Sequence, residues 1–550
     1  MLAVCKPGGM VATVMPHGVL FRGGAEKEIR RKFLQQDLIE AIISLPQNLF
    51  YGAGIPACIL VMRPNLTGQT PNPNKPEARR GRVLFINADA EYLAGRAQNY
   101  LRPEDIEKVA STFERYGEVE NYSKIVTFDE IADSANDFNL NVRRYVDNSP
   151  LPEPHDVRAH LAGGIPVAEI EGNSALFESL GFSPDVLFAH RPADDRYRDF
   201  KPSITERPAI SRLIEADAGL LARTGALRDA LTLWWISHTG SLIALPQGRN
   251  LNAVRSEFLQ GFTEALLPLG VLGNFKLSGV VATWWTETLP DFKTLIENGF
   301  CGVVDGWIDA ISDAVEDDDN VGPAFDPFSH KLVKRTMADY LQQIDDAKEE
   351  IARLKGEKEA FEQSNPPDDA DDEELASWNY AKDLERQVKE LKAECKDAIK
   401  ELTKLDKAAT KKKATDADRR AAEAARRELQ PYFDQMAALE SELAPYEQIK
   451  ADLAAARATF RALTNAFVGE LKNRCAAMGE DEKQALVLEL FAQDLQTGLE
   501  SAVRDKQQEM IRFTENLWDK YQVSLATLRS ERTTVQDTLH HQLRELGYAR

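Results

Sequence analysis

A repeated apolar pattern after Met337 constrains the fold of this chain more than any other feature of its sequence. Seven residues recur there with alternating spacings of four and three: Leu384, Val388, Leu391, Cys395, Ala398, Leu402 and Leu405. A shorter stripe precedes them, formed by Leu341, Ile344, Ile351 and Leu354. These spacings place the apolar residues along one side of a helix, where a second helix can pack, so they predict a coiled coil. Because 550 residues exceed what one hydrophobic core usually serves, two or three structural units are expected, with some of the length in elongated helices.

The two stripes are separated by the acidic, proline-containing run SNPPDDADDEE (Ser364 to Glu374). Paired prolines and clustered carboxylates break a helix and favour a turn. We therefore predict that 337–450 forms two antiparallel arms folded on each other at this run. Residues 451–550 are expected to be helical, with a final apolar set that comprises Phe513, Leu517, Trp518, Tyr521, Leu525 and Leu528.

The N-terminal region follows a different pattern, typical of an α/β layer, over 1–148. Four short β-rich runs are expected to be strands: Val11 to Pro16, which we predict to be buried, Leu38 to Pro46, Pro56 to Met62 and Arg82 to Ala88. Two helices are expected, one over Ala25 to Gln36 with Ala25, Ile29 and Phe33 on its apolar face, and one over Arg102 to Tyr116. Closely spaced prolines in Ser149 to His155 predict a linker over 149–169. Periodic apolar residues and five clustered tryptophans then predict a mainly helical region over 170–330.

Charge and cysteine usage limit the possible environments. With 67 Lys and Arg against 88 Asp and Glu, the formal charge is -21, so any DNA contact must come from a local basic patch. The five cysteines are scattered and lack C-x-x-C spacing, which predicts neither a zinc site nor disulfides and favours a reducing cytoplasm. No run approaches the roughly 18 apolar residues of a membrane span, so no membrane partner is expected.

The stretch KPGGMVATVMPHGVLFRGGAEKEIRRKFLQQDLIEAIISLPQNLFYGAGIPACILVMRP is similar, nearly end to end, to the second half of the methyltransferase domain in modification subunits of type I restriction-modification systems. GRVLFINADAEYLAGRAQNYLRPEDIEKV and DFNLNVRRYVD resemble the continuation of the same family, and ENLWDKYQVSL resembles its C-terminal helix. The resemblance is dense from Met1 to about Asp147 and looser beyond.

This resemblance implies a class I, Rossmann-like sheet that binds S-adenosylmethionine at a Gly-rich turn after its first strand. It also implies an Asn-Pro-Pro-aromatic tetrapeptide after the fourth strand, which holds the adenine amino group for N6 methylation. The runs that begin at Val11, Leu38 and Pro56 correspond to the fifth, sixth and seventh strands, and the first four have no counterpart. We therefore expect an N-terminally truncated chain that is inactive and aggregation-prone alone, with no catalytic, cofactor-binding or metal residue of its own.

Two short motifs partly match the cofactor-binding turn and the Asn-Pro-Pro-aromatic tetrapeptide, which have no other counterpart in the sequence. Asn365, Pro366 and Pro367 are followed by Asp368 instead of an aromatic residue and lie between the helical stripes, so we interpret them as a turn. The lone G-x-G of Gly52 and Gly54 precedes a predicted strand instead of a helix, which favours a tight hairpin over a cofactor loop.

A few residues remain candidates for DNA contact. The resemblance matches Phe50, with Tyr51 beside it, to an aromatic residue that stacks on a flipped adenine, although Phe50 could instead be a hairpin core residue. Arg22, in the FRGG turn, is first a glycine-permitted loop residue and second a phosphate contact. His17 is interpreted as structural. A basic cluster is either a solvated helical face or a DNA-backbone contact, and comprises Lys404, Lys407, Lys411, Lys412, Lys413, Arg419, Arg420, Arg426 and Arg427.

Type I modification subunits work in complexes, so the resemblance implies DNA, a specificity subunit, a second modification subunit and a restriction subunit as partners. The coiled coil and the C-terminal helices are the expected docking surface for the specificity subunit, with internal bracing as the competing interpretation. The leading hypothesis is an incomplete adenine-specific DNA methyltransferase. The alternative is a non-catalytic helical assembly protein that binds the specificity subunit or a separately encoded N-terminal half.

Overall fold

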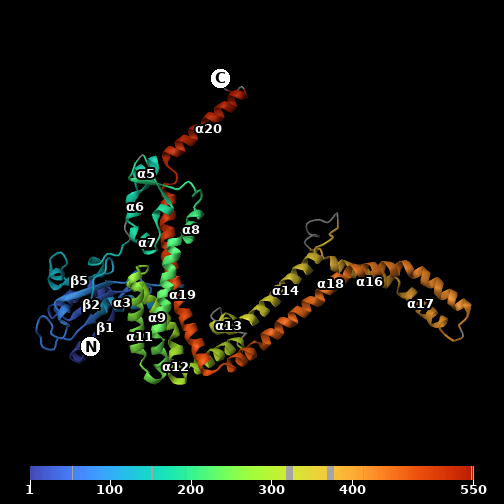
Figure 1. Cartoon of the computed structure of the whole chain (residues 1–550), viewed down its shortest axis with the longest axis horizontal. Helices are drawn as coiled ribbons and strands as arrows, with labels where there is room; N and C mark the ends of the chain where they lie inside the picture. The colour runs from blue at the N-terminus through green and yellow to red at the C-terminus, as the bar shows by residue number, and fades with distance from the viewer. Residues whose placement is uncertain are drawn as a thin grey trace. The chain divides into compact units, whose positions relative to one another are not determined.

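The structure is a computed structural model that describes residues 1–52, 54–149, 153–192, 194–316, 326–367, 377–412, 414–546 and 548. It contains two compact units, which are described separately (Figure 1). Unit 1 comprises Met1–Gly299 together with Leu486–Arg550, and unit 2 comprises Phe300–Ala485. Within the described ranges, no helix has the length and apolar character needed to cross a membrane.

A five-stranded mixed sheet forms the N-terminal part of unit 1. Its strands are β1 (Val11–Pro16), β2 (Ile39–Ser44), β3 (Ala57–Met62), β4 (Arg82–Asn87) and β5 (Ser123–Thr127), in the spatial order β1-β3-β2-β4-β5. β3 is antiparallel to both β1 and β2, β2 is parallel to β4, and β5 is antiparallel to β4. β1, β2 and β4 therefore share one direction, and their carboxyl ends meet at one edge of the sheet.

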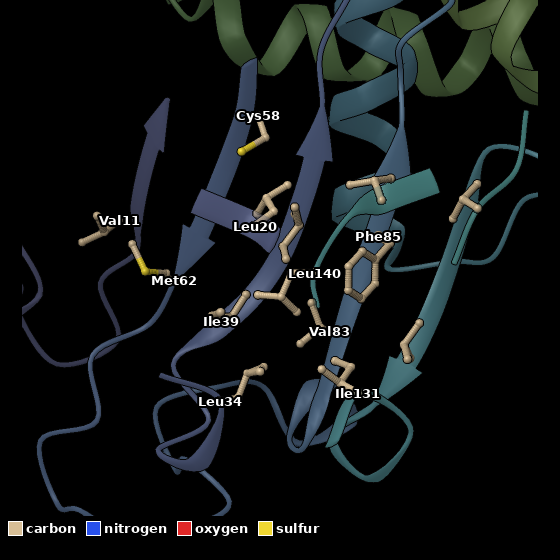
Figure 2. Packing of buried hydrophobic residues seen from close by; sticks show 14 residues of the cluster. Val11, Leu20, Leu34, Ile39, Cys58, Met62, Val83, Phe85, Ile131 and Leu140 are labelled. Atoms are coloured by element: carbon tan, nitrogen blue, oxygen red, sulfur yellow. The ribbon is translucent and has the colours of Figure 1, made fainter. Parts of the chain in front are cut away.

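Helices cover both faces of this sheet. On one face α1 (Gly18–Phe21), α2 (Ala25–Gln35) and α4 (Phe128–Ala132) pack over strand residues that include Ile42 and Phe85 (Figure 2). On the other face α3 (Pro103–Arg115) packs over Ile43, Leu84 and Ile86. Because β2 and β4 are buried on both faces, they are almost continuously apolar. The predicted α/β layer and its helices at 25–36 and 102–116 are thus confirmed.

Three details of the sequence prediction are wrong. β1 is an edge strand in which only Val11 is buried, because its other side has no neighbouring strand among the described residues. β2 and β3 are joined by the loop 45–56, so Gly52 and Gly54 lie in a longer connection and not in a tight hairpin. The third error concerns the orientation of α2.

α2 turns a different face to the core than the apolar spacing predicted. Ala25 and Ile29 are exposed, whereas Arg30 and Leu34 are buried. The Arg30 guanidinium donates hydrogen bonds to the carbonyl oxygens of Val19, at 2.9 Å, and Phe138, at 3.1 Å. A buried arginine is tolerated when acceptors satisfy its donors, and here those acceptors come from two other segments.

The region predicted as a linker is partly folded. α5 (Val157–Ala162) and α6 (Val167–Glu171) lie within 149–169, and residues 150–152 lie outside the described ranges. A three-stranded antiparallel sheet follows, in which β8 (Tyr197–Phe200) lies between β6 (Ile165–Pro166) and β7 (Phe188–His190). The region 170–330 is therefore mainly helical but not entirely so.

The tryptophan-rich segment forms the core of a helical layer in unit 1. Its long helices are α9 (Ala218–Ile243), α11 (Leu251–Leu266), the part of α12 (Asn274–Glu316) that precedes its interruption at Gly299, and α19 (Glu480–Tyr521) from Leu486 onward. The ring of Phe258 packs edge-to-face against Trp234, at a centroid distance of 5.2 Å, and stacks on Trp284 at 5.8 Å. The buried indole nitrogen of Trp284 donates to the carbonyl oxygen of Phe491 at 3.0 Å, which ties α12 to α19. The tryptophans thus have a packing role.

Unit 2 is built along one long helix, α18 (Asp416–Ala476), which continues through two internal prolines, Pro431 and Pro445. α14 (Ala338–Glu362), α16 (Tyr380–Glu394) and α17 (Lys396–Ala409) all pack on α18 (Figure 1). The Tyr340 hydroxyl donates to the Leu463 carbonyl at 2.8 Å, so α14 pairs with the C-terminal half of α18.

This pairing corrects the predicted fold of the arm. Tyr380 bonds Glu442 at 2.8 Å and Arg426 bonds Asp406 at 2.8 Å, so α16 and α17 pair with the N-terminal half of α18. The chain reverses between α17 and α18, and most of the predicted turn at 364–374 lies outside the described residues. The two apolar stripes face α18 in succession because α18 is long enough to cover both.

Candidate functional site

Four polar side chains meet where the parallel strands end. His17 follows β1, Ser44 is the last residue of β2, Asp89 follows β4, and Arg143 lies in the short 3-10 helix Val142–Arg144. Ser44 donates a short hydrogen bond to Asp89, and its hydroxyl oxygen lies 3.1 Å from Nε2 of His17. Arg143 donates from Nε to the other carboxylate oxygen of Asp89 at 2.9 Å. We refer to these four residues as the strand-end cluster.

Hydrogen bonding defines the protonation of this cluster. The Ser44 hydroxyl carries one hydrogen, and that hydrogen is donated to Asp89, so the bond to His17 requires Nε2 to carry a hydrogen. Burial lowers the pKa of His17 below its ordinary value, and the negative charge of Asp89 offsets part of that effect. Burial thus favours the neutral imidazole of His17, and a hydrogen bond between the ring and the backbone of Ala57 opposes part of this effect.

The arrangement does not resemble a serine nucleophile with its base. Ser44 is fully buried, and its hydrogen points to a carboxylate and not to an imidazole. In an activated serine the imidazole takes the hydroxyl hydrogen. The strand-end cluster therefore suits binding and positioning, because it fixes three strand ends through a chain of hydrogen bonds.

A cavity of about 890 Å³ opens beside the cluster. Its lining includes His17, Asp89 and Arg143, joined by the side chains of Gln47, Tyr92, Asn141, Asn148 and Ser149. In open α/β sheets, ligands bind in the crevice outside the carboxyl ends of the strands. The size of the cavity, and amide groups that can both donate and accept, fit a polar, planar ligand.

Phe50 and Tyr51 lie at this same edge, in the loop that leads into β3. Phe50 is 43% exposed and Tyr51 is 89% exposed, which contradicts the alternative that Phe50 is a core residue. The backbone and side chain of Asn99 donate to the carbonyl oxygens of Asn48 and Gln47, both at 2.8 Å. These bonds hold the loop 45–56 against the loop that follows β4.

The described residues do not fit the cradle that S-adenosylmethionine needs. Gly52 and Gly54 precede strand β3, so no helix N-terminus follows them. The glycine-containing turn after α1 does lead into a helix, α2, but the first turn of α2 carries Glu26 and Glu28. Two carboxylates at a helix N-terminus disfavour an anionic group there. We therefore derive no methyl-transfer step from these residues.

The other predicted residues are not members of the strand-end cluster. Arg22 is exposed and pairs with Glu26 at 3.6 Å. Lys411 and Lys412 lie in the turn between α17 and α18, Arg419 and Arg420 lie in the first turns of α18, and all four are exposed. Lys413 lies outside the described residues. Within the described ranges, no group of three or more His, Cys, Asp and Glu side chains could hold a metal ion.

Sequence reasoning missed most of the strand-end cluster. Ser44, Asp89 and Arg143 were not singled out, and His17 was given only a structural role. A signal was present, because a polar residue stands at the end of each of three apolar runs: His17, Ser44 and Asp89. Polar side chains at strand ends mark the ligand-binding edge of an α/β sheet.

Comparisons with known proteins agree on the N-terminal region. Residues 1–153 match the family model described as N-6 DNA Methylase. The chain is 43% identical over 147 residues to the type I restriction enzyme MjaVIII methylase subunit of Methanocaldococcus jannaschii, which covers 26% of this chain and 23% of that protein. It is 31% identical over 157 residues to the MpnII methylase subunit of Mycoplasma pneumoniae, covering 28% and 26%.

A solved structure is also similar to part of the chain. The type I restriction-modification system methyltransferase subunit from Streptococcus thermophilus is 35% identical over 26% of this chain and 27% of its own, with a TM-score of 0.23. The chain thus spans about a quarter of the length of the relatives that it matches.

Proposed function

Because residues 1–153 belong to the N-6 DNA Methylase family, we propose that the chain is a modification subunit of a type I restriction-modification system. Its reaction is S-adenosylmethionine-dependent methylation of adenine N6 in site-specific DNA. The observation that carries this proposal is the 43% identity over 147 residues to a type I methylase subunit, together with the family-model match over residues 1–153, which include all five strands of the main sheet.

The carboxyl edge of the sheet is the part that meets DNA in this proposal. Phe50 and Tyr51 are exposed there, beside the cavity, and a planar side chain compensates part of the stacking that an extruded base loses. The strand-end cluster fixes the strand ends from which these loops depart. An exocyclic amine is a weak nucleophile, so acceptor groups must also orient its lone pair toward the methyl donor.

Helix α20 (Leu525–Glu545) is the proposed docking site for the specificity subunit. Its side chains Leu525, Leu528, Val535 and Leu539 are all exposed. Spacings of three, seven and four place them on one face of the helix. An amphipathic helix with an open apolar face can pair with a helix of a partner.

Methylation of a cognate duplex, assayed with a labelled methyl donor, tests the proposal. The chain is combined with a specificity subunit and with a polypeptide that supplies an Asn-Pro-Pro-aromatic tetrapeptide. We expect adenine methylation that depends on this chain, with Phe50→Ala slower by roughly 5- to 100-fold because base stacking on an aromatic contributes about 1–3 kcal/mol. Phe21→Ala, at an exposed phenylalanine in α1, is the matched control and should have little effect. Methylation at the same rate without this chain would refute the proposal.

A second candidate function is a non-catalytic assembly protein. It is favoured by the position of the only Asn-Pro-Pro in the sequence, which follows α14 in unit 2 and not a strand of the sheet. In that case Phe50→Ala leaves methylation unchanged, while charged substitutions at Leu528 and Val535 on α20 abolish capture of the specificity subunit. The two functions therefore differ in their response to Phe50.

A further inference from the structure

A column of lysines follows the outer face of α17 in unit 2. Lys400, Lys404 and Lys407 are spaced by four and three residues, and Leu402 is the buried residue of this helix. At about 100° per residue, the three lysines project within about 40° of the direction opposite Leu402. They therefore point away from α18, on which α17 packs.

The turn and the start of α18 continue this basic surface. Lys411 and Lys412 follow α17 and are exposed. Arg420 and Arg427 are seven residues apart on α18 and lie opposite the buried Ala422 by the same geometry. We name this surface the basic tip; it comprises Lys400, Lys404, Lys407, Lys411, Lys412, Arg420 and Arg427.

The charge of the basic tip opposes that of the chain. Residues 400–427 contain ten Lys and Arg against five Asp and Glu, whereas the whole chain carries -21. A local excess of positive charge on an acidic chain concentrates attraction for an anion at one place. The basic cluster predicted from the sequence is thus concentrated around the turn between α17 and α18.

Few of these cations are needed to hold the arm together. Arg426 bonds Asp406 across the two helices at 2.8 Å, and it is not part of the basic tip. Lys400 and Lys404 pair with Asp397, at 3.4 Å, and Glu401, at 2.9 Å, on their own helix. Exposed pairs of this kind contribute about 0.2–1 kcal/mol, so the lysines can exchange them for another anion. In the part of the chain that the structure describes, the other five residues of the basic tip have no carboxylate within ion-pair distance.

We propose that the basic tip binds the phosphate backbone of a nucleic acid duplex without reading its sequence. No large apolar or aromatic side chain is exposed within 400–427 among the described residues, so the surface lacks the anchors of a protein interface. Lysines serve as flexible point charges for phosphate. The column from Lys400 to Lys407 rises about 10 Å, and a duplex presents about one charge per 1.7 Å of its axis, so each lysine meets a phosphate.

Salt-dependent binding of a short fluorescein-labelled DNA duplex to the full chain tests this inference by anisotropy. Each phosphate contact contributes about 0.9 to the slope of log K against log salt concentration. The variant with Lys400→Gln, Lys404→Gln, Lys407→Gln and Lys411→Gln should lower that slope by about 3 to 4. Between 50 and 200 mM salt, the unmodified chain should then lose about 100-fold more affinity than the variant.

A matched variant carries the same change of charge elsewhere in unit 2: Lys355→Gln, Lys382→Gln, Lys389→Gln and Lys472→Gln, all at exposed positions. It should keep the slope of the unmodified chain. Equal slopes for the two quadruple variants, or binding of poly-glutamate but not of the duplex, would overturn the proposal. An RNA duplex in a parallel titration identifies which nucleic acid is preferred. The assay needs neither methyl transfer nor a specificity subunit, so its failure is distinct from failure of the proposed function.

Discussion

Glu40 offers the sharpest test of what stabilises the main sheet. It lies where the register of β2 against β3 shifts, between Ile39 and Ala41, and its side chain is fully buried. One carboxylate oxygen accepts from Arg63 at 2.6 Å, and the other accepts from Arg79 at 2.8 Å. A single carboxylate thus pairs with two arginines from the two ends of the segment that connects β3 to β4.

The cost of Glu40→Gln follows from this geometry. Removing one partner from a buried ion pair costs about 3–5 kcal/mol, because the remaining charge stays buried and unpaired. The side chains of Arg63 and Arg79 are 17% and 16% exposed, so both still reach some water. We therefore expect the lower end, about 3 kcal/mol. The substitution preserves shape, so loss of charge and not a cavity is what is measured.

Hydrogen exchange followed by mass spectrometry measures this locally. The sheet region contains no tryptophan, so intrinsic tryptophan fluorescence would report the helical parts of the chain instead. A loss of about 3 kcal/mol speeds exchange of the most protected β2 and β4 amides roughly 100-fold, since about 1.4 kcal/mol is tenfold.

The control is Glu28→Gln, at an exposed glutamate that pairs with Arg31 at 3.3 Å on the surface of α2. It should change exchange by less than about fivefold, because exposed pairs contribute under about 1 kcal/mol. If Glu40→Gln behaved like this control, the ion triad would be energetically unimportant and the reasoning refuted.

Three further predictions concern other parts of the molecule. Gly261→Ala should destabilise the helical layer by about 1–3 kcal/mol, because the new methyl group would lie 2.6 Å from Nε2 of His238. Gly225→Ala, where the new methyl group meets no atom within 4 Å, should stabilise the layer by about 0.5–1 kcal/mol. Urea unfolding followed by tryptophan fluorescence compares the two variants. Burial lowers the pKa of His330 to about 4, below the value near 6.5 in the unfolded chain, so the unfolded state binds more protons between these pH values. The free energy of unfolding of unit 2 should therefore fall by up to about 2 kcal/mol as the pH falls from 6.5 to 4. His330→Asn should flatten this pH dependence in urea titrations. Lys75→Met should cost about 3–5 kcal/mol, measured by exchange of β2 and β4, because the fully buried ammonium donates to a carboxylate and two carbonyl oxygens; unchanged exchange would contradict it.

The sequence predicted those elements whose pattern is local. β2, β3, β4 and α3 were found within a few residues, because their apolar residues are continuous or recur with one period. The edge position of β1 was not predictable, since strand order depends on pairing between distant residues. The face of α2 was wrong for the same reason: the acceptor that allows Arg30 to be buried belongs to Phe138.

The arm shows the same limit in a helical setting. A heptad pattern predicts which face of a helix is buried but does not predict which other helix packs against that face. The acidic run at 364–374 was the strongest local turn signal, yet α14 and α16 both pack on α18. Likewise, α18 continues through Pro431 and Pro445, although proline disfavours the interior of a helix. Long-range pairing prevailed over local propensity in both cases.

Buried charged side chains lie at both ends of the parallel strands of the main sheet. Those at the amino ends stabilise the fold, and those at the carboxyl ends line the candidate site. At the amino ends of β2 and β4, Glu40 and Lys75 are fully buried and their charges are met by partners from the chain itself. At the carboxyl ends, Asp89 and Arg143 are paired but still line an open cavity. A satisfied, closed network stabilises the fold and leaves no group for a ligand. Only the carboxyl edge retains polar groups that a ligand can reach, which is why we locate the candidate site there.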